Sequence, residues 1–82
     1  MNNDALNRII ELLRANNVTS DADELEKLAS KYYSSSLEKK REIAYSIRSM
    51  CHPKWLGDIY IKDVSFKEWY ALLDRLSKSV GR

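Results

Sequence analysis

Apolar residues recur every three or four positions along most of this chain, a period that places them on one face of an α-helix. Neither an internal repeat nor a low-complexity linker divides the chain of 82 residues, so a single all-α domain spanning 1–82 is expected. We expect a compact four-helix bundle with an ordered, aromatic-rich loop between the third and fourth helices. The period predicts helices from Asp4 to about Ala15, from Thr19–Asp21 to about Ser34, from Leu37 to Met50, and from about Phe66 to Val80.

Capping residues stand at the ends of the predicted helices. Asparagine, serine, threonine and aspartate accept hydrogen bonds from free backbone N–H groups, while asparagine and glycine tolerate the left-handed conformation that ends a helix. The expected caps are Asn2 or Asn3, Asn16 and Asn17, Thr19 to Asp21, Ser34 to Ser36, Ser65 in a capping box with Glu68, and Gly81. These signals support the boundaries that the period indicates.

Each predicted helix carries an apolar stripe that we expect to face the core. On the third helix the stripe begins at Leu37 and becomes heavier toward Met50. The fourth helix is the most apolar, with Phe66, Trp69 and Tyr70 among its stripe residues. Four such stripes supply the core of a helical bundle.

The segment from Pro53 to Asp63 lacks the helical period. Proline disfavours helical geometry in the residue before it, so His52 and Pro53 end the third helix. Ile59 and Ile61 would share one side of a strand, but a lone strand in a helical domain is marginal. An ordered and buried loop is therefore expected.

The side chains needed for catalysis or metal binding are scarce. Cys51 and His52, the only cysteine and histidine, are adjacent and would point about 100° apart on a helix, so they form no nucleophile and base pair. They are also too few for a zinc site, and two glycines cannot form a phosphate-binding loop. We therefore expect a protein that is not an enzyme and that needs no cofactor, metal ion or small-molecule substrate.

The cysteine count and the hydropathy pattern bear on location. One cysteine permits no internal disulfide, which fits a reducing compartment. The longest apolar stretches are far shorter than the roughly 20 residues needed to cross a bilayer, and no signal-peptide pattern begins the chain. The sequence thus predicts a cytoplasmic protein that does not contact a membrane.

Charge is unevenly distributed along the chain, with six acids and two bases in residues 1–26 and six acids and twelve bases in residues 27–82. The basic excess raises an alternative function, a small nucleic-acid-binding regulator that contacts phosphates. Glu38 and Glu42 interrupt the basic cluster, and no row of base-reading side chains accompanies it. The residues of this alternative site are Lys39, Lys40, Arg41 and Arg48.

The aromatic residues favour a protein partner. Two tryptophans and five tyrosines exceed what a small helical core needs, and the adjacent pairs Tyr32–Tyr33 and Trp69–Tyr70 cannot both face inward. Exposed tyrosine and tryptophan anchor protein interfaces, and Tyr45 belongs to the same pool of rings. The predicted partner-binding residues combine four of these rings with the acidic start of the second helix and an aspartate in a turn. They are Asp21, Asp23, Glu24, Tyr33, Trp55, Asp58, Tyr60 and Tyr70.

Two stretches, His52 to Tyr60 and Val64 to Trp69, resemble the middle of small bacterial immunity-type proteins, which are encoded beside toxins such as contact-dependent inhibition effectors. The resemblance rests on small helical size and an aromatic-rich loop before a helix that carries tryptophan. It implies tight binding to one cognate toxin and occlusion of its active surface. An acidic helix start would suit a toxin with a basic, nucleic-acid-binding groove.

Overall fold

The computed structural model describes residues 1–80, and within them it contains four α-helices and no strand. The helices are α1 (Asn3–Ala15), α2 (Thr19–Ser34), α3 (Leu37–Met50) and α4 (Phe66–Ser79), and a 3₁₀ turn, η1 (Leu56–Asp58), lies between α3 and α4. The predicted all-α class and four-helix bundle are confirmed. The predicted cap Gly81 lies outside the described residues.

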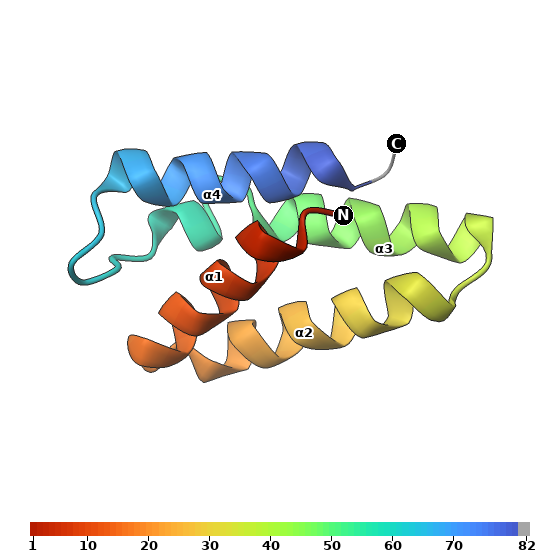
Figure 1. The fold of residues 1–82 in the computed structure, drawn as a ribbon, viewed down its shortest axis with the longest axis horizontal. Coiled ribbons are helices and arrows are strands. Elements are labelled where there is room, and N and C mark those ends of the chain that lie inside the picture. Colours follow the sequence, from red (N-terminus) through yellow and green to blue (C-terminus); the bar gives the residue numbers. More distant parts are fainter. Residues whose placement is uncertain (81–82) are drawn as a thin grey trace.

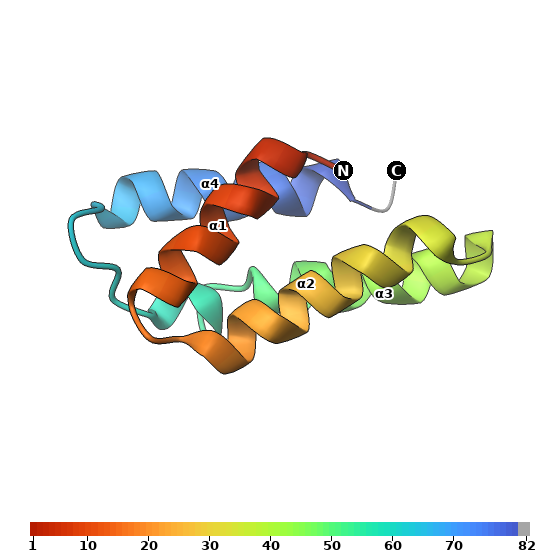
Figure 2. The same ribbon diagram turned by 60° about the horizontal axis from the view of Figure 1, so that its bottom comes forward.

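The α2 and α3 helices form an antiparallel hairpin, and α1 crosses between this hairpin and α4 (Figures 1 and 2). In both views the turn that joins α2 to α3 extends beyond the ends of α1 and α4. At the other end of the molecule, the loop from α3 to α4 wraps around the bundle and carries η1 against α4. The molecule is consequently elongated, with extents of 38 × 22 × 20 Å.

One continuous core joins all four helices and the loop. The loop contributes Leu56 and Ile61, which are both buried, but most residues from Pro53 to Asp63 are exposed, so the expected burial of the loop holds only for the side chains that anchor it. Trp69 on α4 is also buried, and its indole Nε1–H donates a hydrogen bond of 2.8 Å to the carbonyl oxygen of Leu56. This bond fixes η1 on α4 and thereby positions the residues on either side of it. The largest fully buried side chains are Ile9, Leu13, Leu25, Ile47, Met50, Leu56, Trp69 and Leu76.

Most helix ends follow the predicted caps. Asn2, Ser36 and Ser65 each accept a hydrogen bond from a backbone N–H in the first turn of α1, α3 and α4. Asn17 is left-handed, with φ of 62°. The N–H of Val18 donates to the carbonyl of Leu13, which closes α1 as a Schellman motif.

The predicted capping role of Thr19, Ser20 and Asp21 is wrong. The N-cap of α2 is Val18, which offers no side-chain acceptor, and the three polar residues form the first turn of the helix. The physical reason is the tight turn at Asn17. It lets Val18 serve both helices, because its N–H donates to Leu13 at the end of α1 and its carbonyl accepts the N–H of Ala22 at the start of α2.

Two members of the predicted apolar stripes, Leu37 and Phe66, are exposed instead of buried. Tyr70, which the sequence placed both in a stripe and among the partner-binding residues, is exposed as well. Leu37 is the first residue of α3 and lies at the projecting end of the hairpin, which extends beyond the ends of α1 and α4. The core-facing side of α4 is formed by Trp69, Leu73 and Leu76, which are buried. Phe66 and Tyr70 are four residues apart and therefore lie together on a neighbouring, exposed side of the helix.

Removal of a serine cap is expected to cost measurable stability. The variants Ser36→Ala and Ser65→Ala should each lower the free energy of unfolding by about 1 kcal/mol, because a backbone N–H loses its acceptor. The control is Ser30→Ala on exposed α2 surface, expected to change stability by less than about 0.5 kcal/mol. Urea unfolding followed by circular dichroism measures all three, and equal effects at the three serines would contradict the capping assignment.

Candidate functional site

Six aromatic side chains are between 45 % and 70 % exposed: Tyr33, Tyr45, Trp55, Tyr60, Phe66 and Tyr70. The expectation that surplus rings reach the surface is confirmed, and within the two adjacent pairs it is Tyr33 and Tyr70 that face outward. Single exposed rings are ordinary on a protein surface, whereas rings gathered in one place indicate a binding surface. The positions of the six rings relative to one another therefore indicate where a binding surface lies.

A groove at the junction of α2, α3 and the following loop brings two of these rings together. We call it the Trp55 groove; it encloses about 190 Å³. Tyr45 comes from α3, and Trp55 follows the tight turn in which its N–H donates to the carbonyl of His52 at 2.9 Å. The lining residues are Glu24, Leu28, Tyr45, Ser46, Ser49, Met50 and Trp55.

Trp55 is tethered across the helix hairpin to the acidic start of α2. Its indole Nε1–H donates a hydrogen bond of 3.4 Å to Oδ1 of Asp21, and Glu24, one turn further along α2, lines the groove itself. Three residues of the predicted partner-binding set, Asp21, Glu24 and Trp55, are thus brought together from separate parts of the sequence. They form an aromatic groove with an acidic edge.

The other acids at the start of α2 bind a basic residue of this chain. Arg14 on α1 pairs with Asp23 at 2.9 Å and with Glu26 at 2.8 Å. These hydrogen bonds raise the pKa of the Arg14 guanidinium, and the bond to Glu26 has the larger effect. Asp23 belongs to the predicted set, yet it does not line the groove, and its charge is partly neutralised.

A second group of rings, the ring cluster, consists of Tyr60, Phe66 and Tyr70. Phe66 lies 6.5 Å from Tyr60 and 5.8 Å from Tyr70, measured between ring centroids. Gly57 packs closely beneath it, because a Cβ atom there would approach Cε1 of Tyr70 to 3.2 Å and the carbonyl oxygen of His52 to 3.3 Å. Phe66 was expected in the core, so the sequence did not show that it joins the two tyrosines.

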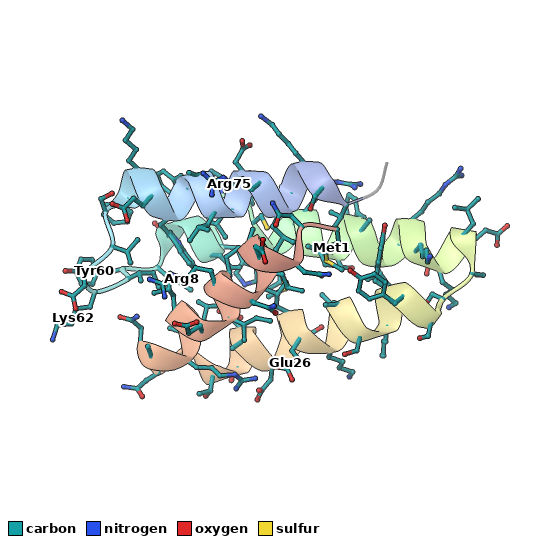
Figure 3. The ribbon with its side chains drawn as sticks, viewed as in Figure 1. Met1, Arg8, Glu26, Tyr60, Lys62 and Arg75 are labelled. Carbon is teal, nitrogen blue, oxygen red and sulfur yellow. The ribbon has the colours of Figure 1, made fainter. Side chains whose placement is uncertain are left out.

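The loop beside the ring cluster is held by a contact that the sequence did not indicate. Asn16, at the end of α1, accepts the N–H of Lys62 at 2.9 Å. Figure 3 shows Tyr60 and Lys62 projecting outward from this loop. Asp58 is exposed, and within residues 1–80 its carboxylate makes no hydrogen bond.

The remaining predicted partner residue, Tyr33, lies elsewhere. Its hydroxyl donates a hydrogen bond of 2.9 Å to Oδ1 of Asn3, and its ring meets that of Tyr32 edge-on at 5.6 Å. Neither residue lines the Trp55 groove. Tyr33 is therefore separate from both groups of rings.

Three of the four basic residues of the alternative nucleic-acid site contact other groups of the chain, and Arg41 is exposed. Lys40 lies 5.5 Å from the ring centroid of Tyr32, and Lys39 approaches Glu42 at 4.0 Å. Arg48 donates to the carbonyl of Val80 at 3.3 Å. No observation on this face specifically favours contact with phosphates.

Cys51 and His52 line the same pocket, of about 480 Å³, with Asp74 and Ser77 of α4, but within residues 1–80 no hydrogen bond joins any two of these side chains. Cys51 is buried, as expected, and burial raises the pKa of its thiol to about 12. His52 is exposed, and its Nδ1 accepts the N–H of Lys54 at 3.1 Å. Across residues 1–80, no three histidine, cysteine or carboxylate side chains gather as metal ligands, and none of the helices is long and apolar enough to span a bilayer.

Burial of Cys51 should make the stability of the protein depend on alkaline pH. An unfolded thiol has a pKa of about 8.5, and the folded thiol has one of about 12. Between these values the unfolded chain releases the proton while the folded chain keeps it, so stability is lost as the pH rises. The wild-type protein should therefore lose more stability between pH 7 and pH 10 than Cys51→Ala, as measured by urea unfolding; identical losses would contradict the burial.

Comparison of the chain with protein-family models, curated proteins and solved structures gave no match. Beyond the predicted residues, the structure adds Leu28, Ser46, Ser49 and Met50 to the groove and Phe66 to the ring cluster. Tyr45 also lines the groove outside the predicted partner-binding set, and of the groove residues outside that set it is the one that carried a sequence signal, as a member of the pool of surplus rings.

Proposed function

We propose that this chain is a protein-binding module of the immunity or inhibitor class, which docks the Trp55 groove on a partner and occludes the partner's working surface. The observation that carries the proposal is the pairing of two exposed rings, Tyr45 and Trp55, with the carboxylate of Glu24 in one groove. Aromatic rings anchor interfaces because they remove a large apolar area from water at little cost in side-chain entropy.

The acidic edge of the groove supports a basic partner. Asp21 and Glu24 lie at the start of α2, and complementary charge across an interface speeds association and rejects wrong partners. A bacterial toxin that binds nucleic acid presents such a basic surface and meets an immunity protein in the cytoplasm. Tyr60, from the same loop as Trp55, and Tyr70 are assigned a second, smaller contact.

The proposal is tested first by locating the partner through the groove. The photo-crosslinking residue p-benzoyl-phenylalanine is introduced at position 45 and, as a control, at position 37, which is equally exposed at the hairpin end. In cells of the native host, a protein captured from position 45 but not from position 37 is then purified. Support requires a one-to-one complex of the two purified proteins and loss of the partner's activity on stoichiometric addition of this chain.

The alternative, a nucleic-acid-binding regulator, is separated by a gel-shift titration at low and moderate salt. Phosphate contacts weaken steeply as salt rises, so binding through Lys39, Lys40, Arg41 and Arg48 would be strongest at low salt. Binding to RNA or DNA at low salt, combined with no groove-specific protein, would overturn the inhibitor proposal. We expect no shift of either nucleic acid.

A further inference from the structure

The chemistry of the Trp55 groove specifies one kind of partner side chain. We propose that the groove receives an arginine of the partner, with its guanidinium beside Glu24 and its plane against the exposed rings. This inference rests on the proposed function, because it names the group through which the partner engages the same surface. Its support comes from the hydrogen-bonding state, the charge and the size of the groove.

The polar groups that line the groove act mainly as acceptors. The hydroxyl of Ser46 donates to the carbonyl of Glu42 at 3.2 Å, and that of Ser49 donates to the carbonyl of Tyr45 at 2.9 Å. Each serine therefore uses its hydrogen within α3 and keeps oxygen lone pairs to offer. The indole N–H of Trp55 is likewise committed to Asp21. A ligand that suits this lining must bring donors.

The charge of the groove is negative and uncompensated among the described residues. No lysine or arginine lines it. Asp23 and Glu26, on either side of Glu24 in sequence, both pair with Arg14, whereas Glu24 makes no ion pair within residues 1–80. Of the three acids Asp23, Glu24 and Glu26, it is therefore Glu24, the one that lines the groove, that remains available to pair with a cation of the partner.

The shape of the groove favours arginine over lysine. A cavity of about 150 Å³ accommodates a benzene ring, so the roughly 190 Å³ of the groove suits one flat group. A guanidinium is planar, carries five donors and no acceptor, and stacks on aromatic faces, whereas an ammonium is a compact, strongly hydrated point charge. Tyr45 and Trp55 offer the faces, while the half-buried Leu28 offers apolar contact to the side-chain stem.

The test uses the isolated protein and two small probes, N-acetyl-arginine amide and its uncharged isostere N-acetyl-citrulline amide. Both are titrated at low ionic strength while NMR records the indole N–H signals, with that of Trp55 assigned through Trp55→Phe. We expect the arginine probe, with a dissociation constant on the order of 1 mM, to shift the signals of Trp55 and of the Leu28 methyl groups. The citrulline probe should shift them far less.

A matched pair of acid variants locates the charge. Glu24→Gln should weaken binding of the arginine probe about fivefold, the upper end of what an exposed ion pair contributes. Glu38→Gln removes an equal charge from the first turn of α3, away from the groove lining, and should leave the affinity unchanged. Equal responses to the two probes, or an unweakened Glu24→Gln variant, would overturn the inference.

The two proposals fail separately. If the purified partner binds through the groove but the arginine probe moves no groove signal, the guanidinium assignment is wrong and the inhibitor proposal stands. If the probe binds and depends on Glu24, but no groove-specific protein is captured, the groove chemistry is upheld and the inhibitor proposal falls.

Discussion

The variant Trp69→Ala is expected to lower the free energy of unfolding by about 3–5 kcal/mol, the range observed when a buried aromatic side chain is truncated to alanine. Trp69 is almost fully buried, and its indole donates to the carbonyl of Leu56. The variant therefore loses the apolar contacts of the ring and leaves that carbonyl without its partner. Since small domains unfold with only about 5–15 kcal/mol, much of the stability should disappear.

Urea unfolding followed by circular dichroism measures this loss, and Phe66→Ala on the same helix is the control. Phe66 is half exposed, so its truncation should cost less than about 1 kcal/mol. Where Trp69→Ala does not fold, Trp69→Phe retains most of the ring and removes the hydrogen bond, with an expected cost of about 1–3 kcal/mol. Equal stabilities of the Trp69 and Phe66 variants would show that η1 is not fixed by Trp69.

The second large effect concerns binding. Trp55→Ala should weaken the complex with the purified partner by about 2 kcal/mol or more, roughly 30-fold, because aromatic anchors at the centre of an interface carry much of its binding energy. Trp55→Phe keeps a ring but loses the hydrogen bond to Asp21, and we expect an intermediate loss. Isothermal titration calorimetry gives the affinities.

Two controls separate binding from folding. Leu37→Ala removes an exposed apolar side chain from the end of the hairpin and should leave the affinity unchanged. The unfolding free energy of Trp55→Ala should stay within about 1 kcal/mol of the wild-type value, because the ring is 45 % exposed. An affinity that is insensitive to Trp55 while responding to Leu37 would move the interface to the hairpin end.

Local signals in the sequence predicted the helices well. The apolar period and the serine caps at Ser36 and Ser65 placed α3 and α4 correctly, because both signals act over three or four residues. The same local reasoning misjudged Phe66, since period alone does not show how wide a face the neighbouring helices cover. Whether a ring at the edge of a stripe is buried depends on tertiary packing.

The site itself could be predicted only in part. Surplus rings and an acidic helix start are visible in the sequence, and they supplied Glu24 and Trp55. The sequence does not show that the ring of Trp55 and the acids at the start of α2 come together. Trp55 and Asp21 are 34 residues apart, and only the folding of the loop against the hairpin brings them into contact. Arg14 pairs with Asp23 but not with Glu24, and this difference is also invisible in the sequence, because it depends on how α1 packs against α2.

The most direct test of the account is an NMR footprint of the purified partner on this chain. The amide and side-chain signals of residues 1–80 are compared before and after one equivalent of partner is added. We predict the largest changes at Glu24, Tyr45, Ser49 and Trp55, with smaller ones at Tyr60 and Tyr70. Changes confined to Leu37 and the basic residues Lys39 to Arg41, with the Trp55 groove unaffected, would contradict it.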